Sequence, residues 1–217
     1  MAKRPSPFPG AEKFMPQKIT LPALRDASKT CQGCDLYKTG TQTVFGQGPK
    51  SAVVMFVGEQ PGDQEDKQGR PFTGPAGRVL DRALDEAGLS RDGLYLTNAV
   101  KHFKWTKRGK RRIHQRPSGP EIRSCGYWLT AELEIVRPGL VVLLGAVAGQ
   151  AMLGSRYRVG EHQGKAEEGS LGSWQGLVVG TIHPSAVLRG PDQEGRDRAY
   201  AGLVSDLVLA RETAARQ

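Results

Sequence analysis

The stretch AVVMFVGEQPGDQED, residues 52–66, decides the fold. Its first half, 52–58, is a continuous apolar run of the kind that is buried on both faces in a parallel sheet. Its second half, 58–66, contains Gly58, Pro61 and Gly62, which favour turn geometry directly after the strand. The stretch therefore predicts a buried strand with polar residues at its carboxyl end.

Further strands of the same character follow along the chain and alternate with helices. Strands are predicted at 94–100, 139–145 and 177–182, and helices at 22–29, 75–87, 120–136, 146–153 and 194–215. The Gly-rich span 154–176 is expected to be a loop or a weak hairpin. This alternation predicts the α/β class, with a single domain built on a central four-stranded parallel sheet and helices on both faces.

The composition limits the partners that the protein is expected to bind. Lys and Arg number 31 against 22 acidic residues, a formal net charge of +9, which favours a nucleic acid or another anionic surface. No apolar run approaches the roughly 20 residues that span a bilayer. The N-terminus lacks an apolar leader segment as well, so we expect a soluble, cytoplasmic protein with no membrane partner. Nothing indicates a dimer, and a monomer is the default expectation.

The ends of the chain differ in character from the middle. Residues 1–20 are basic and rich in proline, and we expect them to form a poorly ordered arm. The folded domain is expected to span residues 21–217.

Three cysteines argue against a disulfide framework and leave metal binding or buried thiols. Cys31 and Cys34 have a two-residue spacing that is compatible with zinc, a redox disulfide or an iron–sulfur cluster. A redox pair would lie at a strand-to-helix turn, which this context does not provide. Zinc or a cluster would need Cys125 and a fourth ligand of another type, for which His102 is the best candidate. The simpler alternative is that His102 is only a polar residue at the end of a strand.

The segment KRGKRRIHQR, residues 107–116, gathers six basic side chains around His114. We expect a flexible loop that meets a polyanion, because each cation that neutralises a phosphate releases counterions. The alternative is an ordinary solvated run of charge. His114 is the unusual member, since it is a titratable nucleophile among cations.

Three polar segments leave the carboxyl ends of predicted strands, at 58–66, 98–102 and 183–189. In parallel sheets with helices on both faces, ligands bind outside these ends. The topology alone therefore predicts that the three segments form one site.

From about residue 20 to residue 215 the chain resembles the family 4 uracil-DNA glycosylases. The resemblance rests on CQGC at 31–34, GEQPG at 58–62, GRPFTGPAG at 69–77, TNAVK at 97–101, the helical Cys125 and HPSAVLR at 183–189. The family has a cysteine where this chain has His102, and it lacks the KRRIH insertion. With GEQPG and KRRIH, the chain is most similar to the UdgX group, whose members excise uracil and remain covalently attached to the abasic DNA.

This resemblance implies a cofactor, a partner and a set of site residues. Cys31, Cys34, His102 and Cys125 would hold a 4Fe–4S cluster, which we expect to be structural. The partner would be uracil-containing DNA, either single-stranded or double-stranded. Phe72 would stack on the flipped base and Gln60 would contact it. Asn98 would recognise its O4 and N3–H, and His183 would donate to its O2 and stabilise the leaving uracilate.

The remaining roles concern the sugar and the DNA backbone. Glu59 would stabilise the cationic sugar or relay a proton, and His114 would attack C1′ in place of water. Attack needs a neutral imidazole, which the surrounding Lys and Arg are expected to favour. Phosphate contacts are expected from Lys110, Arg111, Arg112 and Arg189, while Asp63 and Asp66 would support the loop. The alternatives are a conventional multiple-turnover family 4 glycosylase and a non-catalytic DNA-binding module on the same fold.

Overall fold

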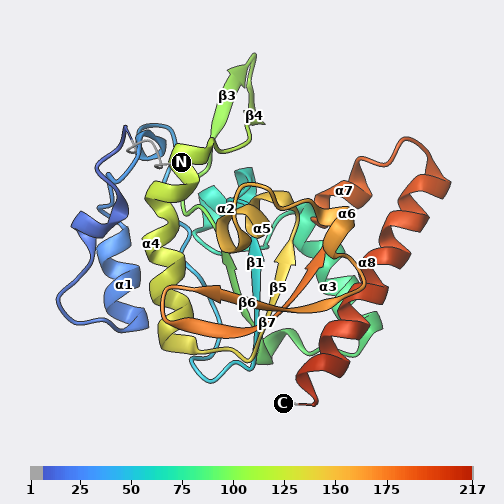
Figure 1. The fold of residues 1–217 in the computed structure, drawn as a ribbon. Helices are drawn as coiled ribbons and strands as arrows, with labels where there is room; N and C mark the ends of the chain where they lie inside the picture. Colours follow the sequence, from blue (N-terminus) through green and yellow to red (C-terminus); the bar gives the residue numbers. More distant parts are fainter. Residues whose placement is uncertain (1–6, 217) are drawn as a thin grey trace.

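The computed structural model describes residues 7–216, which form a sheet with helices on both faces (Figure 1). The strand order is β2-β1-β5-β7-β6. Four of these strands are parallel, as the sequence predicts: β1 (Val54–Gly58), β2 (Tyr95–Asn98), β5 (Leu140–Leu144) and β7 (Trp174–Thr181). The fifth strand, β6 (Ala166–Leu171), lies at the edge and is antiparallel to β7. The Gly-rich span therefore forms most of a hairpin, one of the two alternatives expected for it, and its strand β6 extends the sheet by a fifth strand.

Helices connect the strands and cover the sheet. Their bounds are α1 Leu21–Ser28, α2 Asp63–Gln68, α3 Pro75–Ala87, α4 Gly119–Val136, α5 Ala146–Leu153, α6 Val159–His162, α7 Ser185–Leu188 and α8 Gln193–Ala214. Short 3-10 helices occupy η1 Ala11–Phe14, η2 Asp35–Lys38 and η3 Arg91–Gly93. Within residues 7–216, no helix combines the length and the apolar character that crossing a membrane requires.

The sheet separates two hydrophobic cores because alternate strand residues point to opposite faces. On one face, Met55 and Val57 pack with residues from α1, α4 and α5. On the other face, Val54 and Phe56 pack with residues from α3 and α8. The strands are thus buried on both sides, which explains their continuous apolar sequence.

The N-terminal segment differs from the expected arm. Residues 1–6 lie outside the described residues, but η1 packs against α4. Ala11 is fully buried, and the Gly10 N–H donates to the Gly33 carbonyl at 3.0 Å. A side chain at Gly33 would collide with the Ala11 backbone, so the close approach needs glycine there. The segment is anchored by contacts that its own composition does not reveal.

Two segments expected as loops have regular structure. Residues 63–68 form α2, whose first turn is rich in acids and is capped by Glu65, which accepts from the Gly62 N–H. The basic segment forms a β-hairpin of β3 (Trp105–Arg108) and β4 (Arg111–His114), which projects from the body of the protein (Figure 1). Gly109 supplies the positive φ of its turn. His114 therefore lies on a strand with a fixed register, opposite Trp105.

Candidate active site and cysteine cavity

Polar residues converge at the carboxyl ends of β1, β2 and β7. Gly58 on β1 pairs with Asn98 on β2, and Glu59 follows directly. A Cβ atom at Gly58 would lie 2.3 Å from Asn98 Oδ1 and 2.7 Å from Phe72 Cζ. Glycine at this position therefore allows the Asn98 amide and the Phe72 ring to approach the strand end together. The predicted convergence of the motifs is present in the structure.

His183 lies beside Phe72 at the same edge of the sheet. The two ring centroids are 6.4 Å apart and the ring planes differ by 28°. A Cβ atom at Gly145, which follows β5 with a φ of 91°, would lie 2.9 Å from His183 Cβ. The strand end after β5 thus makes room for the imidazole.

The tautomer of His183 follows from its contacts with Ser185. The backbone N–H of Ser185 donates to His183 Nδ1 at 3.2 Å, so Nδ1 is an acceptor and the proton of the neutral ring is on Nε2. Burial, together with the smaller effects of Arg189 and His114, lowers the pKa of His183 to about 4. The ring is therefore neutral at pH 7 with an N–H donor at Nε2.

His114 reaches the site from the hairpin and faces Glu59. Its Nε2 atom lies 3.4 Å from Glu59 Oε1. That oxygen is buried and makes no hydrogen bond among the described residues. Burial raises the pKa of Glu59, while Arg116 and Arg189 oppose the rise. Glu59 thus has an unsatisfied acceptor directed at the imidazole.

Burial lowers the pKa of His114, and the charge of Arg189 lowers it further. The neutral ring that attack would require is thus favoured, but the causes differ from the expected ones. The nearby cation is Arg189, beyond α7, and the basic residues of the hairpin do not contribute. The Phe103 ring, 6.1 Å away between centroids, covers one side of the imidazole.

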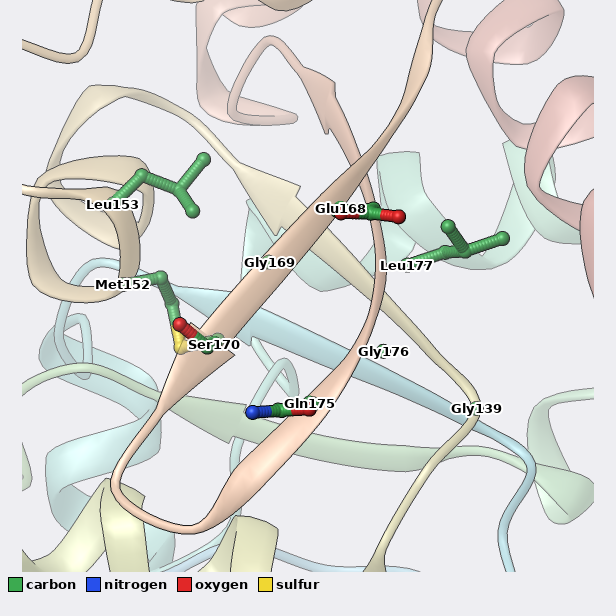
Figure 2. Close-up of a pocket in the computed structure, with 9 residues that line it drawn as sticks. All are labelled: Gly139, Met152, Leu153, Glu168, Gly169, Ser170, Gln175, Gly176 and Leu177. Atoms are coloured by element: carbon green, nitrogen blue, oxygen red, sulfur yellow. The ribbon is translucent and has the colours of Figure 1, made fainter.

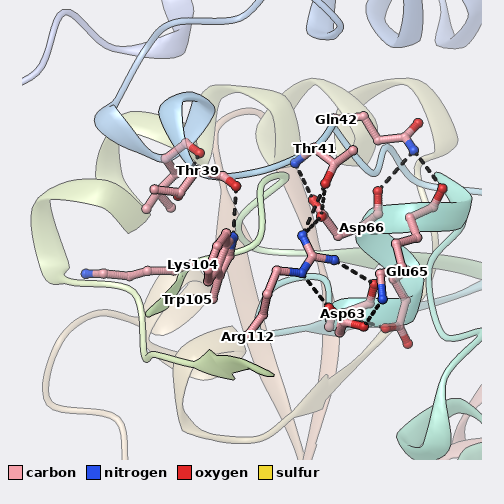
Figure 3. A network of polar contacts seen from close by, with 12 residues as sticks. Thr39, Thr41, Gln42, Asp63, Glu65, Asp66, Lys104, Trp105 and Arg112 are labelled. Atoms are coloured by element: carbon pink, nitrogen blue, oxygen red, sulfur yellow. Dashed lines mark hydrogen bonds and ion pairs between the residues drawn. The ribbon is translucent and has the colours of Figure 1, made fainter. Parts of the chain in front are cut away.

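Arg112 anchors the hairpin to α2 through the two acids that were expected to support it (Figure 3). Its Nε lies 2.5 Å from Asp63 Oδ1 and its Nη1 2.6 Å from Asp66 Oδ2. Asp66 is fully buried and also accepts from the N–H and the hydroxyl of Thr41. The Arg112 guanidinium also lies over the rings of Phe103 and Trp105. We expected Arg112 to bind phosphate. The structure does not fit this role, because the guanidinium is already bound to two carboxylates and packed on two rings within the protein.

Gln60 holds the base of the same hairpin. Its side-chain Nε2 donates to the carbonyls of Gln115 at 2.9 Å and Lys104 at 3.3 Å, and its Oε1 accepts from the Lys104 N–H at 3.0 Å. Gln60 is buried, and its amide group is fully used by these backbone partners. The expected contact of its side chain with a base therefore does not fit this geometry.

The other basic residues of the hairpin face solvent. They make no ion pair within residues 7–216, and Arg189, which is also exposed, makes none either. Arg189 lies close enough to Glu59 and His114 to affect the pKa of both. Exposed cations without an ion pair thus lie on the projecting hairpin and beside the site; they are Lys107, Arg108, Lys110 and Arg111 on the hairpin and Arg189 beside the site.

The four expected ligands line one small, largely buried cavity, which we call the cysteine cavity. They are Cys31, Cys34, His102 and Cys125. The Trp128 indole N–H donates to Cys31 Sγ at 3.4 Å, and the Lys101 N–H donates to Cys125 Sγ at 3.2 Å. Donors directed at cysteine sulfurs are typical of iron–sulfur sites, where they stabilise the charged cluster.

The pKa values of three of these four side chains are shifted in the direction that favours the neutral form. Burial raises the pKa of Cys34 to about 11 and of Cys125 to about 12, and lowers that of His102 to about 4. In residues 7–216, no group of three or more His, Cys, Asp or Glu side chains could hold a metal ion. A cluster differs from one ion because each ligand binds its own iron, so its ligands stand farther apart.

A separate cavity lies between α5 and the β6–β7 hairpin (Figure 2). Met152 and Leu153 line it from α5, and Glu168 and Leu177 line it from the hairpin. Gly139, which precedes β5, also lines it, so the cavity lies near the amino end of that strand. It is distinct from the site at the carboxyl ends.

Sequence reasoning missed several residues that shape the site. Ser185 fixes the tautomer of His183, and its position two residues after that histidine could have suggested this contact. Arg116 lies close enough to Glu59 to lower its pKa. The carboxylate of Glu65 accepts from the N–H groups of Gly62 and Gly74 and so joins the two loops. Arg91 contacts the Phe72 backbone across 19 residues, for which the sequence has no local signal.

Comparison with known proteins agrees with this arrangement. Residues 45–207 match the model of the uracil DNA glycosylase superfamily. The chain is 36% identical to a type-4 uracil-DNA glycosylase of Thermotoga maritima over 171 residues, which cover 77% of this chain and 83% of that protein. It is 34% identical to the type-4 enzyme of Pyrobaculum aerophilum, with coverage of 82% and 89%. For the type-4 enzyme of Archaeoglobus fulgidus, the identity is 36% and the coverage 75% and 80%. The chain therefore belongs to the uracil DNA glycosylase superfamily.

Proposed function

We propose that this protein excises uracil from DNA and is then captured on the abasic sugar through His114. The excision step is supported by membership of the superfamily and by similarity to type-4 uracil-DNA glycosylases over more than three quarters of their length. The capture step rests on one observation in particular. A neutral imidazole lies 3.4 Å from an unsatisfied carboxylate oxygen at the same strand ends.

In the first step the base is bound and leaves. The flipped uracil stacks on Phe72, and this stacking offsets the free-energy cost of extruding the base from the DNA. Asn98 donates to O4 and accepts from N3–H, a pattern that cytosine does not present. The N–H at His183 Nε2 donates to O2, where negative charge develops as the bond from C1′ to N1 breaks. Uracil leaves with the electron pair of that bond, and the sugar becomes cationic.

In the second step His114 takes the place of water. The lone pair of a ring nitrogen forms a bond to C1′, and the resulting imidazolium loses its N–H proton. Glu59 is the nearest carboxylate and accepts this proton, which leaves a neutral, stable N-linked product. An imidazole that is held in place reaches an effective molarity of roughly 10⁵–10⁸ M, which is enough to outcompete water.

The attachment of the hairpin at two points supports this positioning. Arg112 is bound to Asp63 and Asp66 from α2, and Gln60 binds the backbone on both sides of the hairpin. His114 lies between these anchors. Phosphates of the DNA contact the exposed cations, among them Lys110, Arg111 and Arg189, which position the strand without reading its sequence.

We propose further that the cysteine cavity holds a 4Fe–4S cluster through Cys31, Cys34, His102 and Cys125. The convergence of the four side chains and the N–H donors directed at two of the sulfurs support this assignment. When bound, the cluster would supply a covalent cross-link between the N-terminal segment, the loop after β2 and α4. In this assignment His102 takes the place of the cysteine that the family pattern has at this position.

The capture step is tested with a single-stranded oligonucleotide that contains one uracil, resolved on a denaturing gel. Wild-type protein should give a band shifted by the mass of the protein, and His114→Ser should release uracil without this band. Free abasic product from the wild type, with no shift, would indicate a conventional multiple-turnover glycosylase. Neither a shift nor uracil release would indicate a non-catalytic DNA-binding module.

The cluster is tested by iron and sulfide analysis together with the visible absorption spectrum. Purified wild-type protein should contain iron and be brown, and His102→Ala should lose both properties. His102→Cys, which restores the family's ligand, should retain them. Zinc without iron in the wild type would overturn the cluster assignment.

A further inference from the structure

Phe72 has a backbone conformation that its residue type disfavours. Its φ is 54°, in the left-handed region, where a side chain with a Cβ is strained. Phe72 is 5% exposed, and its ring faces His183. Such strain persists only where the surrounding structure holds the residue in place. The contacts of this backbone therefore show what orients the ring.

Arg91, on η3, contacts the backbone of the Phe72 loop. Its Nη2 donates to the carbonyls of Phe72 at 3.2 Å and Pro71 at 3.3 Å. Its Nη1 is paired with the carboxylate of Asp81 on α3. One guanidinium thus connects the helix, the loop and the segment before β2. Hydrogen bonds from a charged donor are the stronger kind, and the ion pair fixes their direction.

Two further features agree with a loop that is held rigidly. A Cβ atom at Gly77 would lie 2.0 Å from the Phe72 carbonyl oxygen, so the first turn of α3 is packed directly against this peptide. The Gly74 N–H donates to Glu65 Oε1 at 2.9 Å, which fixes the loop on its other side. Of these contacts, only those of Arg91 reach the carbonyl of the strained residue through a side chain.

We propose that Arg91 is a positioning residue of the base pocket. It holds the Phe72 backbone in its left-handed conformation and thereby fixes the ring on which the flipped base stacks. This inference rests on the proposed excision of uracil. Arg91 itself touches neither the base nor the sugar, so its removal should weaken binding of the base while the fold and the chemistry of His114 stay intact.

The test uses Arg91→Gln and Arg91→Lys. Lysine can still pair with Asp81, but its single nitrogen cannot occupy the positions of two guanidinium nitrogens. We expect both variants to raise the inhibition constant of free uracil by roughly tenfold, the effect of losing one charged hydrogen bond. The protein concentration for half-maximal uracil release should rise similarly. Asp81→Asn, which keeps the carbonyl contacts, should have a smaller effect.

Arg198→Gln is the matched control, because Arg198 is also ion-paired to an acid but lies on the exposed face of α8. It should leave the inhibition constant unchanged. The thermal midpoint of Arg91→Lys should stay close to that of the wild type, which separates positioning from folding. If Arg91→Gln does not fold, Arg91→Lys decides alone. Wild-type affinity for free uracil in Arg91→Lys would overturn the inference.

The experiments distinguish a failure of the proposed function from a failure of the role of Arg91. If the wild type releases no uracil, the proposed function is wrong. If the wild type releases uracil and Arg91→Lys and Arg91→Gln bind free uracil as tightly as it does, the role of Arg91 is wrong and the function stands. A loss of rate without a loss of uracil affinity would also contradict the positioning role.

Discussion

The Nε2 atom of His114 lies 3.4 Å from Oε1 of Glu59, although Glu59 follows a strand of the main sheet and His114 belongs to the hairpin. Glu59 comes directly after β1, an inner strand of the main sheet, and His114 is the last residue of the projecting hairpin. This contact defines where the end of the hairpin lies relative to the base pocket. The proposed capture of the sugar depends on this position.

Replacing Glu59 by Gln should slow adduct formation more than uracil release. The amide cannot accept the proton that the imidazole loses, and removal of a positioned base typically costs about 100-fold or more. Quenched time courses that measure both free uracil and the shifted band separate the two steps. Equal slowing of both steps would contradict the relay role and assign Glu59 to the cationic sugar.

Adduct formation should depend on pH differently from uracil release. The pKa of His114 is lowered from 6.5 by burial, so the ring is neutral at pH 7 and becomes protonated only as the pH falls below 6.5. Protonation removes the lone pair, so the yield of adduct should fall in this range. The pKa of His183 is about 4, so uracil release should persist to lower pH.

The raised pKa of Glu59 acts in the same direction, because a protonated carboxyl cannot accept the proton from His114. The pH profile of Glu59→Gln should therefore retain only the contribution of His114. Parallel loss of adduct and of uracil release across the same pH range would contradict this assignment.

Arg112 and Arg111 are neighbours with different predicted roles. Arg112→Gln removes the ion pairs to Asp63 and Asp66 and should slow adduct formation by about tenfold, since roughly 1.4 kcal/mol of positioning energy corresponds to that factor. Arg111→Gln should instead weaken DNA binding and reduce the salt slope by about 1. Adduct kinetics at saturation and binding isotherms at several salt concentrations measure the two effects. An altered salt slope in Arg112→Gln, with normal adduct kinetics, would reverse the assignment.

The most buried ion pair joins Lys101 to Glu132, with 2.5 Å between Nζ and Oε2 and almost no exposure of either side chain. Lys101 Nζ also donates to the Asn98 carbonyl at 2.8 Å, so the pair supports the end of β2. Lys101→Met should lower the free energy of unfolding by about 3–5 kcal/mol, because it leaves Glu132 as an unpaired buried charge.

Lys101→Met/Glu132→Gln should recover part of this loss, since it removes the unpaired charge. The control is Lys29→Met, which breaks an exposed pair with Asp26 and should cost at most about 1 kcal/mol. Denaturant unfolding measures all three variants. If Lys101→Met costs no more than the control, the buried pair does not stabilise the fold.

The parallel strands were predictable because their signal is local. Burial on both faces requires continuous apolar runs, and the residues after each run are at the carboxyl edge by topology. The convergence of Glu59, Asn98 and His183 follows from this alone. Edge strand β6 was not predictable in this way, since its residues alternate between exposed and half-buried and the segment contains two adjacent acids.

The parts that sequence could not predict depend on contacts between distant residues. The hairpin has few residues that favour strands, and Gln60 holds its base across 55 positions. Because these hydrogen bonds use the whole Gln60 amide, the side chain has no group left for a base, and the sequence motif alone does not reveal this. Arg112 looks like a DNA contact by composition, and only the position of α2 makes it an internal anchor.

Mapping the cross-linked peptide tests the central claim most directly. Trypsin should release residues 113–123 as one peptide, because Pro117 protects the bond after Arg116. After reaction with a uracil-containing strand and nuclease digestion, mass spectrometry should find the remnant of the abasic sugar on this peptide, at His114. No stable adduct, or an adduct at another residue such as Lys110, would contradict capture by His114.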